Sequence, residues 1–188
     1  KQLAKKLGYV YVDTGAMYRA IALYLLREKV KPDDTEAVSN TCTGAEVTLI
    51  YQDGEQAVLL NGENVNGFIR TEEVGNMASR ASAVPAVRER LLQLQRDLAS
   101  SENVIMDGRD IGTHVLPNAE VKVFLIASVD ERAQRRHQEN ILKGFPSDIE
   151  KLREEIATRD KLDSEREVAP LKKATDAIEI DTTSLSIQ

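Results

Sequence analysis

The sequence has little of several features that mark specialised classes of protein. A single cysteine, Cys42, among 188 residues rules out an intrachain disulfide and suits a reducing cytoplasm. No apolar run approaches the length that spans a membrane, and the N-terminal residues are unlike a secretory signal. The 25 basic and 31 acidic residues give a formal net charge of -6, which argues against binding nucleic acid or membranes through bulk charge. We therefore expect a cytoplasmic protein with no nucleic-acid or membrane partner.

Aromatic residues are also scarce, at 4% with no tryptophan, so the core must consist mainly of Leu, Ile, Val and Ala. The two histidines, His114 and His137, have no cysteine or histidine partner at the spacing of metal ligands, which makes a zinc site improbable. A chain of this length fits one domain with an insert.

Helix-like and strand-like segments alternate along most of the chain. The expected helices are residues 1–8, 16–29, a short helix after Pro32, a helical stretch over 70–101 broken near Pro85, 129–143 and 148–162. The expected strands are residues 9–12, 104–106, the run VKVFLIAS over 121–128, which reads as a buried parallel strand, and a last short strand with a polar end in AIEIDTTSLSIQ, residues 177–188. This alternation indicates an α/β fold with a mostly parallel sheet.

One segment departs from that alternation. Two strand-like runs flank Asp53-Gly54, a strong hairpin turn signal, and a second turn is expected at Asn61-Gly62. We therefore expect a small antiparallel insert.

Three expected strands end in residues suited to holding an anion: Asp13-Thr14-Gly15, Asp107-Gly108-Arg109-Asp110 and Asp181-Thr182-Thr183. Ligands of open parallel sheets bind at the carboxyl ends of the strands. Each sequence, taken alone, is equally typical of a strand-to-helix turn with a capping side chain. The arginines strengthen the ligand hypothesis, because guanidinium groups match phosphate oxygens and stay charged. Arginines at or near the ends of elements are Arg19, Arg88, Arg109, Arg159 and Arg166.

Two charge-rich helices each allow two interpretations. The run DERAQRRHQEN contains Arg132, Arg135 and Arg136, which form either an exposed helix with i,i+4 ion pairs or a mobile lid over a transferring phosphoryl group. The run TRDKLDSEREVAP places Arg159, Asp163 and Arg166 on one helical face. These three form either a self-contained salt-bridge ladder or one side of a nucleotide pocket.

Taken together, these segments resemble the bacterial cytidylate kinases, nucleoside monophosphate kinases of the P-loop class. The matching motifs are DTGAMYR, DGRDIGT and RDKLDSERE followed by PL, in family order. The resemblance covers nearly the whole chain and implies a three-layer P-loop kinase fold with a mostly parallel sheet, a small antiparallel monophosphate-binding insert and a helical lid. It implies one kinase domain over residues 1–188, with a core over about 1–40 and 99–188, the insert over about 41–98 and the lid over about 130–160. We expect a monomer.

The resemblance also implies a role for each matching residue. Thr14, Arg19 and Arg109 would lie near the α-phosphate of CMP or dCMP. Ser79, Arg88 and Asp110 would read the cytosine. Arg159 and Asp163 would meet the ribose and phosphate, and Arg166 would close the site. The expected catalytic set is Arg19, Arg109, Arg132, Arg136 and Arg159, with Arg132 and Arg136 as lid residues near ATP.

The family transfers phosphate from ATP with Mg²⁺, for which no side chain of this sequence is assigned as a ligand. The family's glycine-rich loop GxxxxGK[ST], which holds the donor phosphates, does not occur in the sequence. We therefore interpret the sequence as lacking roughly the first two dozen family residues and the last helix. The intact protein is expected to transfer phosphate, and the 188-residue polypeptide alone to have little or no activity. The alternatives are a related kinase acting on UMP or shikimate, an inactive nucleotide-binding module, and a structural interaction domain.

Overall fold

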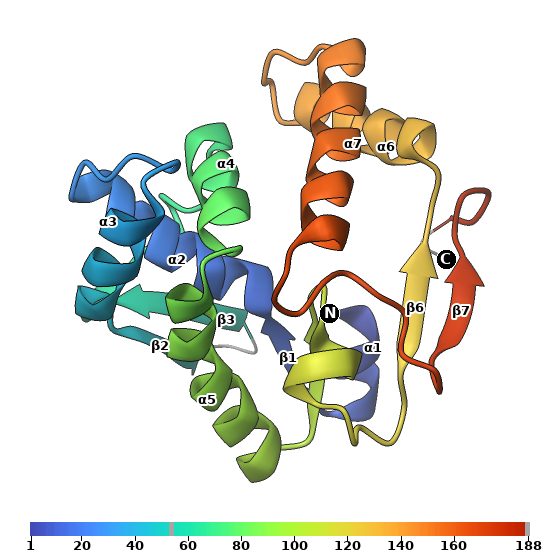
Figure 1. Ribbon diagram of the computed structural model, residues 1–188. Helices are drawn as coiled ribbons and strands as arrows, with labels where there is room; N and C mark the ends of the chain where they lie inside the picture. The colour runs from blue at the N-terminus through green and yellow to red at the C-terminus, as the bar shows by residue number, and fades with distance from the viewer. Residues whose placement is uncertain (53–54, 187–188) are drawn as a thin grey trace. The chain divides into compact units, whose positions relative to one another are not determined.

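The computed structural model describes residues 1–52 and 55–186. Its helices are α1 (Gln2–Leu7), α2 (Thr14–Arg27), α3 (Thr35–Thr41), α4 (Glu72–Ala81), α5 (Pro85–Ser101), α6 (Val129–Leu142) and α7 (Ile149–Glu165), with short turns η1 (Cys42–Gly44) and η2 (Ile111–Val115). Its strands are β1 (Val10–Asp13), β2 (Val47–Gln52), β3 (Glu55–Leu60), β4 (Glu63–Asn64), β5 (Val104–Asp107), β6 (Val123–Ile126) and β7 (Ile178–Asp181) (Figure 1). Strands alternate with helices outside β2–β4, which confirms the predicted α/β class.

The boundaries of several elements follow from local chemistry. Helix α1 ends at Gly8, whose left-handed backbone (φ 67°) suits a residue without a side chain. Helix α5 begins at Pro85, where the missing amide hydrogen has no intrahelical role. The break predicted near Pro85 therefore separates α4 from α5.

The strands form three small groups. Strand β1 pairs with β5 in parallel register, with Asp13 opposite Asp107, and β6 pairs with β7 in parallel. Strands β2, β3 and β4 form an antiparallel sheet, which confirms the predicted insert. The turn predicted at Asp53-Gly54 lies outside the described residues.

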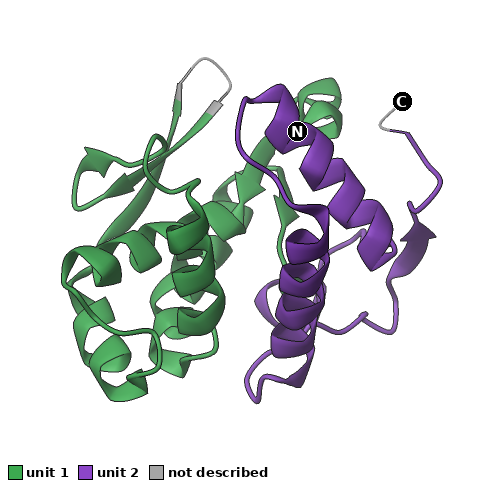
Figure 2. Ribbon diagram, turned by 90° about the horizontal axis from the view of Figure 1, so that it is seen from above, with its two compact units in different colours: residues 1–111 green, residues 112–188 purple. Residues whose placement is uncertain are grey.

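The chain divides into two compact units, residues 1–111 and residues 112–188 (Figure 2). A continuous hydrophobic cluster lies in the first unit, where α2 contributes Met17, Ile21 and Leu25, and further residues come from β1, α3, the antiparallel sheet, α4, α5 and the segments between them. Cys42 is buried in this cluster as a free thiol. The predicted division into core, insert and lid stays a prediction.

The interpretation of 121–128 as a buried strand was wrong in one respect. Strand β6 has the expected parallel neighbour, but Val123 is 50% exposed and Leu125 is 64% exposed. A strand is buried on both faces only where helices cover the sheet. In the second unit α6 and α7 pack mainly on each other.

Candidate functional site

The ends of β1 and β5 are tied together by the residues predicted to hold an anion. Asp13 caps α2, because its Oδ1 accepts a hydrogen bond from the amide of Ala16 at 3.1 Å. Thr14 is buried, and its hydroxyl donates to the carbonyl oxygen of Asp107 at 2.7 Å. Gly108 leaves room for this bond, since an added Cβ would lie 2.5 Å from Thr14 Oγ1. The first turn of α2 is therefore fixed beside the carboxyl end of β5.

Asp13 also attaches the antiparallel insert to β1. Its amide donates to Gln56 Oε1 at 2.9 Å, and its Oδ2 accepts from Arg70 Nη2 at 2.7 Å. A cavity of about 210 Å³ lies beside these contacts. The residues that line it are Lys1, Tyr11, Asp13, Ala16, Gln56, Val58, Asn66 and Arg70.

Arg19 crosses from α2 to the start of α4. Its Nη1 donates to the carbonyl oxygen of Ile69 at 3.0 Å and to that of Thr71 at 3.5 Å. Gly75 of α4 leaves space for the Arg19 guanidinium, since an added Cβ would lie 3.3 Å from both of its terminal nitrogens. The guanidinium is therefore held a single helical turn from Thr14, the neighbouring residue predicted to contact phosphate.

The structure brings Arg88 and Asp110 into direct contact. Both residues are 4% exposed, and Arg88 Nη2 donates to Asp110 Oδ2. Arg88 Nη1 donates to the carbonyl oxygen of Ser82 at 3.2 Å, and the Arg88 guanidinium carbon lies 5.4 Å from the centre of the Tyr18 ring. Ser82 Oγ in turn donates to the carbonyl oxygen of Ser79 at 2.8 Å.

Two polar atoms of this cluster have unused hydrogen-bonding capacity. Within the described part of the chain, Ser79 Oγ and Arg88 Nε are buried and have no hydrogen-bond partner. Buried polar atoms nearly always have a partner, and those that do not call for an explanation. Arg88, which is bonded to the Asp110 carboxylate, and Ser79, which is linked to Arg88 through Ser82, thus each offer one unsatisfied atom to a small ligand with both donors and acceptors.

The end of β5 carries a perturbed carboxyl. Burial raises the pKa of Asp107 above its usual range, against a hydrogen bond from the Tyr11 hydroxyl that lowers it. Burial, together with that hydrogen bond, also raises the pKa of Tyr11. Arg109 is exposed and its charge opposes the upward shift of Asp107. A carboxyl whose charge is disfavoured at a strand end is a typical feature of a functional site.

In the second unit, the three residues predicted to share one face of a helix do form a ladder of charges, but Arg166 follows the last residue of α7 and has an extended backbone. Asp163 is 4% exposed and lies 3.5 Å from Arg166 Nη1 and 3.8 Å from Arg159 Nε. Arg166 Nε also donates to the carbonyl oxygen of Ala169 at 2.6 Å. The contacts show that the salt-bridge interpretation is correct as far as it goes, and they leave the nucleotide-pocket interpretation open.

The three arginines of α6 differ in their surroundings. Arg132 makes a bidentate pair with Asp160 of α7 and donates to the carbonyl oxygen of Ala127 at 3.1 Å. Arg135 pairs with Glu131 at 2.7 Å and donates to the carbonyl oxygens of Thr182 and Leu185. Arg136 is exposed and, within residues 1–52 and 55–186, makes no ion pair or hydrogen bond through its side chain.

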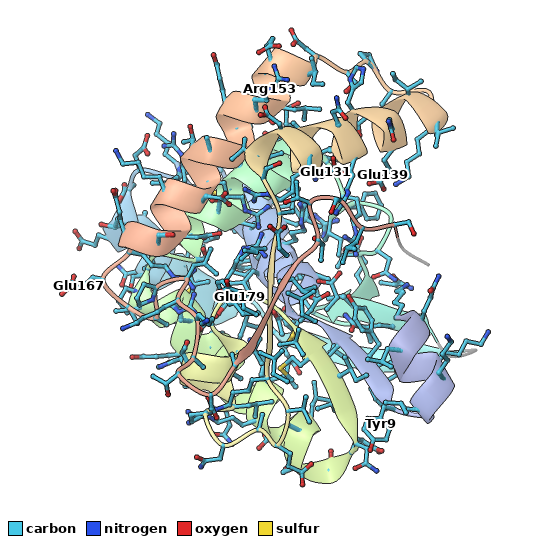
Figure 3. The ribbon with its side chains drawn as sticks, turned by 90° about the vertical axis from the view of Figure 1, so that its right-hand side faces the viewer. Tyr9, Glu131, Glu139, Arg153, Glu167 and Glu179 are labelled. Carbon is cyan, nitrogen blue, oxygen red and sulfur yellow. The ribbon has the colours of Figure 1, made fainter. Side chains whose placement is uncertain are left out.

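Other charges on these helices form ordinary surface pairs. Figure 3 shows Glu131 and Glu139 along α6 and Arg153 on α7. Glu139 pairs with Lys143 one turn further on, and Arg153 lies 2.8 Å from Asp130. The interpretation of DERAQRRHQEN as a helix with i,i+4 pairs is therefore confirmed for Glu131 with Arg135 and for Glu139 with Lys143.

Sequence reasoning missed two residues that the geometry singles out. Tyr18 lies beside Arg88, and its place next to Arg19 in DTGAMYR was the available signal. Asp107 was named as the first residue of DGRD at a strand end, but no individual role was assigned to it. Ser82 acts through its backbone carbonyl, for which no sequence signal exists.

Among the described residues, no group of three or more His, Cys, Asp or Glu side chains is arranged to hold a metal ion. The helices described contain none that combines the length and the apolar character needed to cross a membrane.

Comparison with known proteins gives a consistent result. The family model described as cytidylate kinase matches residues 1–188. A protein of Geobacillus sp. (strain WCH70) named cytidylate kinase is 58% identical over 188 residues, which are 100% of this chain and 84% of that protein. Proteins of the same name from Anoxybacillus flavithermus (strain DSM 21510 / WK1) and Bacillus cereus (strain AH187) are 57% and 55% identical, over 100% of this chain and 83% and 84% of their own lengths.

Proposed function

Because the chain belongs to the cytidylate kinase family, we propose that the protein transfers the γ-phosphoryl group of ATP to CMP or dCMP, giving CDP or dCDP. The observation that supports this most directly is the buried pair of Arg88 and Asp110, together with two buried polar atoms without hydrogen-bond partners, Arg88 Nε and Ser79 Oγ. A ligand that bonds to these atoms would remove the cost of leaving them unsatisfied.

Cytosine fits this cluster better than uracil. Its exocyclic amine donates hydrogen bonds, and its ring nitrogen N3 and its carbonyl oxygen accept them. The Asp110 carboxylate accepts from the amine, whereas Ser79 and Arg88 donate to the acceptors. Uracil presents a carbonyl in place of the amine, and two acceptors facing each other repel. The preference for cytosine therefore rests on one carboxylate held in place by Arg88.

The phosphate of the acceptor nucleotide is assigned to the first turn of α2 and its neighbours. The helix N-terminus at Thr14 attracts an anion. Arg19 is one turn along the same helix, and Arg109 follows the end of β5. Guanidinium groups bind phosphate oxygens in pairs and keep their charge at any relevant pH, so these residues hold the α-phosphate for attack.

Transfer requires alignment and neutralised charge rather than a covalent nucleophile. An oxygen of the acceptor phosphate attacks the γ-phosphorus of ATP, and the bond to the β-phosphate oxygen breaks. The acceptor phosphate is already largely ionised at neutral pH, so no general base is needed. Arg159, Asp163 and Arg166 are assigned to the ribose and phosphate, and Arg132 and Arg136 to the transferring group. Arg136 is the better candidate of the last two, because Asp160 already holds Arg132.

Mg²⁺ would neutralise charge on the donor phosphates. It usually keeps several waters and binds through one or two carboxylates plus substrate phosphates, so a site made only of side chains is not required. We further propose that the protein acts in the cytoplasm as a monomer.

The test compares CMP, dCMP, UMP, AMP and shikimate as acceptors, with ATP and Mg²⁺, in the protein as it is naturally produced. We expect ADP release with CMP and dCMP far above that with the other acceptors. Equal turnover with UMP or shikimate would indicate a related kinase. Binding of CMP without turnover would indicate an inactive module. Saturating CMP at 100 times its Kd should add about 2.7 kcal/mol to the free energy of unfolding, and no shift would favour a structural domain.

A further inference from the structure

The Tyr18 ring lies against the buried guanidinium of Arg88, and we infer that Tyr18 is a positioning residue that holds Arg88 in the orientation needed to read the base. This inference rests on the proposed function, because it assigns Tyr18 a part in the preference for cytosine. Tyr18 belongs to the same helix as Thr14 and Arg19, and it precedes Arg19 directly.

Arg88 is in an environment that opposes its charge. It is 4% exposed and lies in the first turn of α5, where the helix dipole is unfavourable to a cation. Asp110 supplies a full negative charge and the Ser82 carbonyl a partial one. The face of the Tyr18 ring supplies the third negative surface, at 5.4 Å from its centre to the guanidinium carbon. A contact between a cation and an aromatic ring is strongest where water is excluded.

These contacts leave one nitrogen of the Arg88 guanidinium available for a ligand. The two terminal nitrogens are engaged by Asp110 and Ser82. Those two bonds fix the edge of the planar group, but they resist tilting about that edge only weakly. The Tyr18 ring, whose centre lies 5.4 Å from the guanidinium carbon, blocks movement of the group to that side and so limits the tilt. Arg88 Nε, which has no hydrogen-bond partner in the described part of the chain, then keeps a fixed direction toward a ligand acceptor.

A second contact of the same kind provides a matched control. Arg27 lies over the ring of Phe68 at 5.7 Å and pairs with Glu63. Phe68 is 52% exposed, and the side chains of Arg27 and Glu63 are 41% and 46% exposed. None of these residues has a role in the proposed base site. Replacing Phe68 therefore removes an arginine–ring contact without touching Arg88.

The experiment measures kcat/KM for CMP and for UMP in the unsubstituted protein and in the variants Tyr18→Leu, Tyr18→Phe and Phe68→Leu. We expect Tyr18→Leu to lower the ratio of CMP to UMP about tenfold, mainly through a higher KM for CMP, since the contact can be worth that factor when desolvated. Tyr18→Phe keeps the ring and should keep the ratio. Phe68→Leu should also keep it. Thermal unfolding of each variant checks that it is folded, and Tyr18→Met replaces Tyr18→Leu if the latter is not.

Each other outcome overturns the inference. An unchanged ratio in Tyr18→Leu, with equal losses for both nucleotides, would mean that the ring contacts the base directly or supports the fold. A loss in Tyr18→Phe equal to that in Tyr18→Leu would assign the effect to the hydroxyl. Introducing Tyr18→Leu into an Arg88→Lys background should change the ratio no further, and an additional drop there would show that Tyr18 does not act through Arg88. The unsubstituted protein decides the proposed function separately, by whether it phosphorylates CMP at all.

Discussion

Arginine and aspartate meet in the interior of both units, but the two settings differ. In the first unit, Arg88 and Asp110 are in hydrogen-bond contact and lie next to a continuous hydrophobic cluster. In the second unit, Asp163 lies 3.5 and 3.8 Å from the nearest nitrogens of Arg166 and Arg159, and the side chain of Arg159 is 39% exposed. Leu152 and Asp163 are the buried residues of α7.

The difference indicates that the two groups of charges have different functions. A pair that is tightly bonded within a packed core is fixed in one geometry, which suits reading the shape of a base. In the second unit the side chains of Arg166 and Asp163 are also buried, but the side chain of Arg159, at 39% exposure, can move relative to Asp163. Such a ladder suits a group that must rearrange when phosphate arrives.

The largest expected effect breaks the tight pair. Asp110→Ala leaves the guanidinium of Arg88 buried without its counter-charge, and such losses typically lower the free energy of unfolding by about 3–5 kcal/mol. We expect that loss in denaturant titrations, together with loss of the preference for CMP over UMP in any folded variant that remains.

The matched change in the second unit is Asp163→Ala. Asp163 lies 3.5 Å from Arg166 Nη1 and 3.8 Å from Arg159 Nε, and Arg166 keeps its bond to the carbonyl of Ala169. We expect a smaller loss of about 1–3 kcal/mol. Equal losses for the two variants would show that the spacing of the charges does not distinguish the two settings.

The sequence predicts a contact well when the two residues are close together in the chain, and poorly when they are far apart. The contact of Arg159 with Asp163 was predictable, because a helix fixes which residues share a face, whereas Arg166 meets Asp163 from an extended backbone beyond the end of α7. The capping by Asp13 and the break at Pro85 were predictable for the same reason, since both are local. The family motifs placed Arg88 and Asp110 in one predicted pocket, but not in direct contact with each other.

The features that could not be predicted depend on contacts between distant segments. The ring of Tyr18 meets Arg88 across 70 positions of the sequence, and no local pattern encodes that meeting. The exposure of β6 was missed for the same reason, because an apolar run predicts a strand but not what covers it. Likewise, nothing in DERAQRRHQEN shows that Arg132 is bound to Asp160 whereas Arg136 is not.

A second prediction separates structure from chemistry within the second unit. Arg132→Ala removes the bidentate pair with Asp160 that joins α6 to α7, and it should lower the free energy of unfolding by about 1 kcal/mol because the pair is partly exposed. Arg136→Ala should change stability by no more than about 0.5 kcal/mol. It should nevertheless lower kcat roughly a hundredfold to a thousandfold, as removal of one charge-stabilising group does in other enzymes.

Denaturant titration and steady-state kinetics on the same two variants check this prediction. If Arg132→Ala abolished turnover at unchanged stability, whereas Arg136→Ala had no effect on turnover, the assignment of the two residues would have to be reversed. Arg135 is a suitable third position, because its bonds to the carbonyls of Thr182 and Leu185 predict a structural effect alone.

The smallest expected effect concerns Asp107 at the end of β5. Burial raises its pKa in the folded protein above the unfolded value, so the folded state is penalised once the carboxyl ionises. The native protein should therefore lose stability, relative to Asp107→Asn, as pH rises from below the ordinary aspartate pKa through the raised one. Above and below that interval, the difference between the free energies of unfolding of the two proteins should not change with pH.

Urea titrations of the native protein and Asp107→Asn at pH values from about 3 to 7 measure this difference. The Tyr11 hydroxyl donates to the same carboxyl and favours the charged form, so the two influences oppose each other. A difference that shrinks as pH rises would mean that this hydrogen bond outweighs burial. Tyr11→Phe then provides the control, because removing the hydroxyl should widen the difference if burial is the larger influence.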